Sequence, residues 1–195
     1  TGSCSGTIVD WNWNSGTGPV AALVKSSATS QWAVGPATAA GPKDGQNWLA
    51  TNPNGYYVDS MREWVRLPTL DLSAWASCKV KITVDVWRYA EGLSTRVDGG
   101  NLQYTTSDPA TATDWKVVDG GSMAYDGPTT ASSCGTTCFV YGQKLWAGRA
   151  APYAKTGVFT SAAPMGSQLS LRFTFFSDGS LASYDGLYVK SLRVE

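Results

Sequence analysis

Histidine is absent from the 195-residue sequence, which limits the chemistry that the chain can perform. Ser-His-Asp and Cys-His catalytic arrangements and histidine-rich zinc hydrolase motifs are therefore excluded. Glutamate occurs only as Glu63, Glu91 and Glu195, none of them in a recognisable catalytic motif. A glycosidase needs two carboxyl groups about 5 to 10 Å apart. Asp85 and Asp98 are a conceivable pair, but a solvated face or a turn cap is the commoner explanation, so no catalytic residue is assigned.

Charge is also scarce. Charged residues make up 15% of the chain, and the formal net charge is zero. Without a basic cluster, the chain lacks the electrostatic basis for binding nucleic acid or an anionic membrane. No apolar run approaches the roughly 20 residues that a membrane-spanning helix needs. We therefore expect a soluble chain that neither binds nucleic acid nor inserts into a membrane.

Aromatic residues and turn formers, by contrast, are abundant. The chain holds 43% hydrophobic residues, with Gly 21, Trp 9 and Tyr 9. Short apolar segments alternate with turn signals, and no amphipathic helix is convincing. This pattern predicts an all-β fold, an antiparallel β-sandwich or jelly roll of the concanavalin-like or galactose-binding-like kind. Because no linker is evident, we expect one domain over residues 1–195.

Two segments show the period-two alternation of half-buried strands. In residues 78–89, one face is formed by Cys78, Val80, Ile82, Val84 and Val86. In residues 169–176, one face is formed by Leu169, Leu171, Phe173 and Phe175. Shorter strands are expected at residues 7–13, 47–51, 101–106, 115–118, 145–146 and 157–160, and one or two within 56–67. Residues 21–25 are expected to be a helical turn or irregular.

Both of the clearest strands place aromatic rings on their polar face. Trp87 and Tyr89 follow Asp85 on the first strand, and Phe176 lies on the side of Arg172 on the second. Such a ring is either covered by another layer or kept for a ligand, and sugars stack their C–H faces on rings beside polar groups. If the two strands share a sheet, these five residues form a glycan cleft. The other tryptophans are interpreted as packing residues first: Trp11, Trp13, Trp48, Trp64, Trp115 and Trp146.

The four cysteines are Cys4, Cys78, Cys134 and Cys138. Zinc binding is the weaker interpretation, because histidine is absent and one C-x-x-x-C lacks a second pair of ligands. Disulfides allow three pairings, between which the sequence does not choose. Cys134 and Cys138 are close enough to close locally, which would leave Cys4 with Cys78. Together with the start at Thr1, the cysteines predict a mature secreted product or an excised module.

A series of short motifs carries a family resemblance. The motifs are Trp32 with Gly41-Pro42, Asp44-Gly45 with Trp48, Leu67-Pro68 with Leu70-Asp71-Leu72-Ser73, Trp87 with Glu91 and Asp98-Gly99-Gly100, and Arg172-Phe173 with Asp178 and residues 185–189. Their order resembles the MAM-like jelly-roll modules. These include the accessory domain of immune-inhibitor-A metalloproteases and the cleaved-adhesin modules of secreted bacterial proteases. Related jelly rolls serve as carbohydrate-binding modules. The resemblance covers most of the chain.

The resemblance implies a structural calcium as the one cofactor. The matching positions are Asp10 and Asp44, and Asn47 and Asp185 could supply further oxygen ligands. Lys190, with Ser191 after it, stands where the family usually has two acids, and an ammonium group there would replace a metal. The alternative is that these Asp and Asn residues form turns, with an ion pair between Asp10 and Lys190.

Taken together, these features predict a non-catalytic carbohydrate-binding module of a secreted bacterial polysaccharide-active protein. The expected partner is a polysaccharide or glycan, and the chain is expected to be a monomer or one module of a larger protein. A protein-interaction or stabilising accessory domain of a secreted protease is the first alternative. A small polysaccharide lyase or hydrolase is the second.

Overall fold

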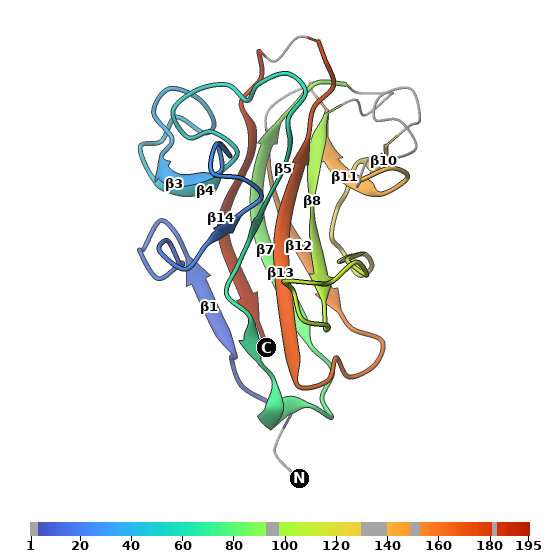
Figure 1. Cartoon of the computed structure of the whole chain (residues 1–195). Helices are drawn as coiled ribbons and strands as arrows, with labels where there is room; N and C mark the ends of the chain where they lie inside the picture. Colours follow the sequence, from blue (N-terminus) through green and yellow to red (C-terminus); the bar gives the residue numbers. More distant parts are fainter. Residues whose placement is uncertain (1–3, 93–97, 130–139, 149–152, 181–182) are drawn as a thin grey trace.

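The alternating segments pair into two antiparallel sheets that pack face to face in the computed structural model (Figure 1). The structure describes residues 4–92, 98–129, 140–148, 153–180 and 183–195. Over these ranges there is no α-helix, only one turn of 3-10 helix, η1 (Ser73–Trp75). Nor does this part of the chain hold a helix long and apolar enough to cross a membrane. The predicted all-β antiparallel sandwich is confirmed.

The first layer, here called the β7 sheet, has the strand order β12-β7-β14-β4-β3, with β1 paired to β14. Its strands are β1 (Val9–Asn12), β3 (Ala33–Pro36), β4 (Asn47–Ala50), β7 (Lys81–Tyr89), β12 (Tyr153–Thr160) and β14 (Gly186–Val194). The register of β14 against β7 shifts between Val189 and Ser191, which marks a bulge at Lys190.

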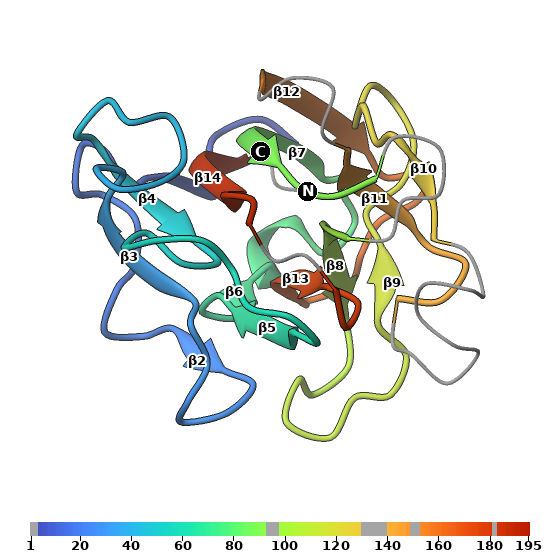
Figure 2. The ribbon, with the colours of Figure 1, turned by 90° about the horizontal axis from the view of Figure 1, so that it is seen from above.

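The second layer, the β13 sheet, has the order β10-β11-β8-β13-β5-β2, with β6 paired to β13 and β9 to β8. Its strands are β2 (Val24–Lys25), β5 (Arg62–Arg66), β6 (Leu70–Asp71), β8 (Gly99–Thr105), β9 (Lys116–Val117), β10 (Gly127–Pro128), β11 (Lys144–Ala147) and β13 (Gln168–Phe176). Seen from above, β5, β13 and β8 lie in one layer, and β14, β7 and β12 lie behind them (Figure 2).

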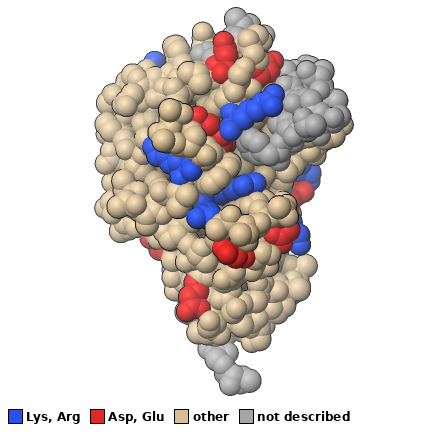
Figure 3. All heavy atoms as spheres, in the orientation of Figure 1, with Lys and Arg blue, Asp and Glu red and all other residues tan. Residues whose placement is uncertain are grey.

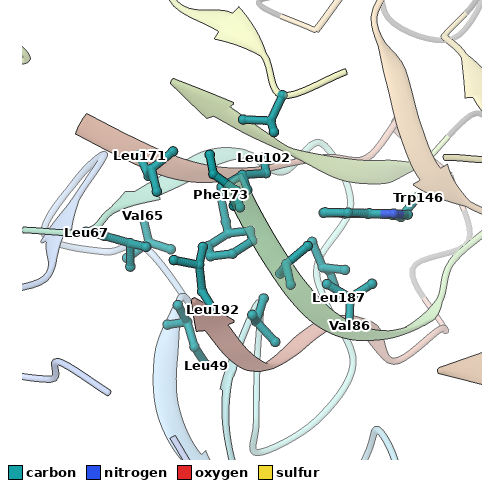
Figure 4. Packing of buried hydrophobic residues seen from close by; sticks show 14 of the residues in the cluster. Leu49, Val65, Leu67, Val86, Leu102, Trp146, Leu171, Phe173, Leu187 and Leu192 are labelled. Atoms are coloured by element: carbon teal, nitrogen blue, oxygen red, sulfur yellow. The ribbon is translucent and has the colours of Figure 1, made fainter. Parts of the chain in front are cut away.

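The core lies between the layers and follows the predicted alternation. The apolar residues of β7 and β13 that the pattern placed on one face are buried, and Phe173 is fully buried among residues of both sheets. Figure 4 shows Phe173 from β13 among side chains that include Leu187 and Leu192 of β14. Burial of apolar surface, at about 25 cal/mol per Å², therefore holds the two sheets together.

One local prediction was wrong. Residues 21–25 were expected to be a helical turn or irregular, but Val24 and Lys25 form the edge strand β2, which pairs with Arg66 and Val65 of β5. A two-residue strand has no alternation to detect, because its pairing depends on the neighbouring strand.

Of the pairings that the sequence left open, the structure shows a disulfide between Cys4 and Cys78, whose Cα atoms are 5.4 Å apart. The bond ties the segment before β1 to the segment before β7, at the end of the sandwich where both termini lie (Figure 1). Cys134 and Cys138 lie outside the described residues, so their pairing stays a prediction.

Replacing both cysteines tests the contribution of this bond. The double variant Cys4→Ala/Cys78→Ala is expected to lose about 2–5 kcal/mol of unfolding free energy, because the bond closes a long loop in the unfolded chain. Denaturant titration of the variant and of the unreduced wild type measures the difference. A loss below about 0.5 kcal/mol would contradict the prediction.

Candidate ligand-binding face

The residues predicted to form one glycan cleft are divided between the two sheets. Asp85, Trp87 and Tyr89 lie on β7, which pairs with β12 and β14, whereas Arg172 and Phe176 lie on β13, which pairs with β5 and β8. The prediction of a single shared cleft was conditional on a common sheet, and that condition is not met. Two outer faces therefore have to be considered separately.

On the β7 sheet, Trp87 is covered by its neighbours. Its side chain packs with Trp48 and Tyr188, and 9% of the residue is exposed. The ring meets Tyr188 edge-on, with centroids 5.4 Å apart. Asp85 accepts hydrogen bonds from the hydroxyls of Thr156 and Ser191, at 2.6 and 2.7 Å. The sequence left two alternatives for Trp87, cover by other residues or exposure to a ligand. The structure shows the first.

A hollow of about 270 Å³ lies beside these residues, and Trp48, Asp85 and Lys190 contribute to its lining. The ammonium group of Lys190 lies over the Trp48 ring, 5.9 Å from its centroid. Typical small-molecule sites range from about 300 to 1,000 Å³. The hollow is thus just below the size of a usual ligand pocket.

On the β13 sheet, Phe176 is also covered. It is fully buried against Val140, Leu145 and Ala147, and the Arg62 guanidinium lies 5.8 Å from its ring centroid. Phe176 cannot stack on a ligand in this arrangement. Its ring instead packs against the Arg62 guanidinium.

Arg172, the other predicted residue on β13, lies in the middle of a cluster that the strand register assembles. Arg172 is opposite Arg66 of β5 on one side and Gln103 of β8 on the other, and the next pair along β5 and β13 is Trp64 with Thr174. Residues opposite one another in antiparallel strands share a face. We define the arginine face as Arg62, Trp64, Arg66, Gln103, Trp115 and Arg172.

Two tryptophans hold the Arg172 guanidinium. Its carbon Cζ lies 4.1 Å from the ring centroid of Trp115 and 5.6 Å from that of Trp64. Guanidinium groups stack on aromatic faces through cation–π attraction, which is strongest when the group is partly desolvated. All three side chains are half-buried, so the planar group is fixed rather than free in solvent.

A chain of hydrogen bonds fixes the polar edge of the same group. Arg172 Nε donates to Gln103 Oε1 at 2.7 Å, and Gln103 Nε2 donates to Gln143 Oε1 at 2.7 Å. Asn101 Nδ2 also donates to Gln143 Oε1, at 2.9 Å. The Thr174 hydroxyl donates to Asn101 Oδ1, at 2.6 Å. Because Asn101, Gln103 and Thr174 are fully buried, this network orients Arg172 with little freedom.

The arginine face is locally positive although the chain is neutral. Burial, and secondly the nearby charge of Arg66, lower the pKa of Arg172 to about 10, so the group still carries its charge at neutral pH. Figure 3 shows Lys and Arg side chains gathered across the middle of this side of the molecule, over β5 and β13. Such a site offers charge and flat rings together.

Most of the arginine face was not predicted. Trp64 and Trp115 were interpreted as packing residues, and Arg62, Arg66 and Gln103 were not assigned. One signal was present: Arg62, Trp64 and Arg66 alternate with Glu63 and Val65, which is the pattern of a strand with one polar aromatic face. The position of Trp115 had no comparable signal, because it reaches the face from the segment before a two-residue strand.

The four predicted calcium ligands lie on β1, in the loop before β4, at the start of β4 and just before β14. Asp10 lies on β1 and pairs with Arg193 rather than with Lys190, at 3.7 Å. Asp44 accepts hydrogen bonds from the Gln46 backbone and the Trp48 indole. Asp185 is nearly buried, which raises its pKa, while a backbone bond from Gly41 and the charge of Lys43 act in the opposite direction. Asn47 begins β4 and is exposed.

Among the described residues, a different group of acids meets the distance requirement for a cation. One ligand oxygen each from Glu91, Asp98 and Asp178 lies within 4.8 Å of the others. Asp98 is fully buried, accepts a bond from the Tyr57 hydroxyl at 2.5 Å and one from the Asp178 backbone at 2.8 Å. Asp10, Asp44 and Asp185 are not among these three acids, and the calcium set that the resemblance implied stays a prediction.

Comparison with solved structures shows the fold. The chain is similar to the K1 cleaved adhesin domain of Lys-gingipain from Porphyromonas gingivalis W83, with 13% sequence identity, 98% of both chains covered and a TM-score of 0.51. It also matches the CBM22-2 xylan-binding domain of Xyn10C from Paenibacillus barcinonensis, with 13% identity, 96% of this chain and 98% of that chain covered, and a TM-score of 0.46. No family model and no curated protein matches the chain. At this identity, the first likeness establishes a cleaved-adhesin-like jelly-roll fold and nothing finer.

The buried acid Asp98 makes stability depend on pH. Burial raises its pKa to about 7, so the folded chain retains a proton that the unfolded chain releases near pH 4. Raising the pH from about 4 to about 7 should therefore lower the unfolding free energy, by at most about 1.4 kcal/mol per pH unit from this group. Denaturant titrations of wild type and Asp98→Asn across this range isolate the effect. Parallel pH profiles of the two proteins would contradict it.

Proposed function

We propose that the chain is a non-catalytic carbohydrate-binding module whose ligand lies on the arginine face. The observation that carries the proposal is the stack of Arg172 between Trp115 and Trp64, 4.1 and 5.6 Å from their ring centroids. Sugar rings need flat aromatic surface for their C–H faces and fixed polar groups for their hydroxyls. The arginine face supplies both, from β5, β8, β13 and the segment just before β9.

The proposal extends to the setting of the module. We place it in a secreted bacterial polysaccharide-active protein; the disulfide supports the secreted part of this proposal, because disulfides are typical of oxidising compartments. The finer kinship to MAM-like modules is part of the same proposal. The acids near Asp98 do not support a glycosidase, because the carboxyl group of Asp98 is buried and both of its oxygens accept hydrogen bonds.

An accessory domain of a larger secreted protein, such as a protease, is the second candidate. It is favoured by the shared fold with a cleaved adhesin domain of Lys-gingipain. Such a domain would contact protein rather than glycan. Binding to the polysaccharide panel described next separates the two functions.

Removal of one stacking ring tests the glycan site. We expect Trp115→Ala to weaken binding to the recognised polysaccharide at least tenfold, since aromatic anchors contribute most of the energy of such contacts. Isothermal titration against plant, algal and microbial polysaccharides measures it, with Tyr56→Ala as the control because Tyr56 is an exposed aromatic outside the face. Wild type that binds no polysaccharide, or equal binding by Trp115→Ala, would contradict the proposal.

The residues predicted on β7 define a competing location for the same ligand. There, Asp85 and Tyr89 accompany the covered Trp87. Loss of binding in Trp87→Phe, with binding retained in Trp115→Ala, would place the glycan on the β7 sheet. Thermal melts of both variants check that neither substitution unfolds the protein.

A further inference from the structure

The arginines of the two sheets differ in their partners. On the β7 sheet, Arg88 pairs with Asp126 at 2.6 Å and Arg193 pairs with Asp10 and Glu195 at 3.7 and 3.3 Å. On the β13 sheet, no carboxylate of the described residues forms an ion pair with any of the three arginines of the arginine face: Arg62, Arg66 and Arg172. Among the residues that the structure describes, the arginines of the β7 sheet are thus ion-paired and those of the arginine face are not.

The arrangement of these arginines is electrostatically unfavourable in isolation. Arg66 and Arg172 are direct cross-strand neighbours, and like charges in that position destabilise a sheet. Burial and the Arg66 charge both act against the charged form of Arg172. A bound anion would relieve both effects, because it would supply the missing counter-charge where the dielectric is lower than that of water.

Arg172 has unused capacity to hold such an anion. Within the described chain, its hydrogen bonding is limited to Nε, which donates to Gln103, and its terminal nitrogens have no partner. Arg66 uses Nη1 to donate to the Pro109 carbonyl at 2.7 Å. A guanidinium fork oriented by stacking on Trp115 and Trp64 matches the two oxygens of a carboxylate.

Two acids on segments next to β8 and β9 do not take that role. Asp114, beside the end of β8, accepts bonds from the hydroxyls of Thr105 and Ser107, which lower its pKa. Asp119 pairs with Lys144 at 2.9 Å. Since no acid of the described residues pairs with Arg62, Arg66 or Arg172, we assign their counter-charge to a ligand.

We propose that the arginine face selects acidic polysaccharides, with Arg172 and Arg66 binding the carboxylate of a uronate residue whose ring lies against Trp115 or Trp64. This inference rests on the proposed function, because it names the class of glycan for the same surface. A neutral sugar would use the rings but would leave the guanidinium pair uncompensated. A uronate uses both.

The test compares each acidic polymer with its uncharged counterpart. Polygalacturonate, alginate and a glucuronan are titrated into the full chain beside their carboxyl-reduced forms, which keep the backbone and lose the charge. Neutral polysaccharides and dextran sulfate complete the panel. We expect at least one uronate polymer to bind at least tenfold more tightly than its reduced form, with affinity falling as salt is added.

Variants assign the effect to the arginines. Arg66→Gln and Arg172→Lys are each expected to weaken uronate binding at least tenfold, the second because lysine keeps the charge but loses the planar fork. Arg193→Gln is the matched control, since Arg193 is an ion-paired arginine of the other sheet, and its affinity should stay within twofold. Thermal melts confirm that all three variants are folded.

Each remaining outcome overturns one identifiable statement. Equal affinity for native and reduced polymers, or binding of neutral polysaccharides only, with Trp115→Ala still defective, would overturn the acidic class and leave the glycan function intact. Tighter binding of dextran sulfate than of every uronate would replace the carboxylate by a sulfate. Failure of every polysaccharide to bind would instead refute the proposed function.

Discussion

The burial of one face of β13 is the constraint on which the rest of the structure depends. Leu169, Leu171, Phe173 and Phe175 lie between the sheets with at most 1% of each residue exposed. Because side chains alternate, a slip of one residue would move this whole set to the outside and bring polar residues into the core. The register of β13 is therefore fixed, and with it the position of Arg172 opposite Arg66 and Gln103. The charged cluster is a consequence of the core.

The repulsion between the clustered arginines is offset by stacking and hydrogen bonds from neighbouring residues, and not by acidic side chains. Trp64 and Trp115 stack on Arg172, and a buried chain of amides and a hydroxyl fixes its polar edge. Cation–π contacts contribute about 0.5–2 kcal/mol, in the range of the repulsion expected between two half-exposed like charges. The packing can thus keep a positive group in place without an acid, which leaves its charge available to a ligand.

Sequence patterns predicted the parts of this molecule that depend on local alternation. The core faces of β7 and β13 and the all-β class follow from spacing alone, whereas the sequence left the choice among three disulfide pairings open. Spacing does not show whether an outward ring is covered, because the covering residues come from elsewhere in the chain. Val140 and Leu145 cover Phe176, and Trp48 and Tyr188 cover Trp87. The partners of the predicted calcium ligands were not visible in the sequence either, since Asp10 pairs with Arg193 and Asp44 accepts bonds from Gln46 and Trp48.

The likeness to an adhesin domain at 13% identity follows from the same separation of faces. A sandwich needs apolar inner faces of matching size, and many sequences satisfy that requirement. The half-exposed outward residues are nearly independent of it, because Arg66 and Arg172 contribute no side chain to the core between the sheets. Arg66 and Arg172 could therefore be replaced without loss of the fold, and the strands would still place whatever residues follow at the same cross-strand positions. Ligand preference in such a domain should consequently be sought in the outward residues of β5, β13 and β8, and not in the architecture that they share with other jelly rolls.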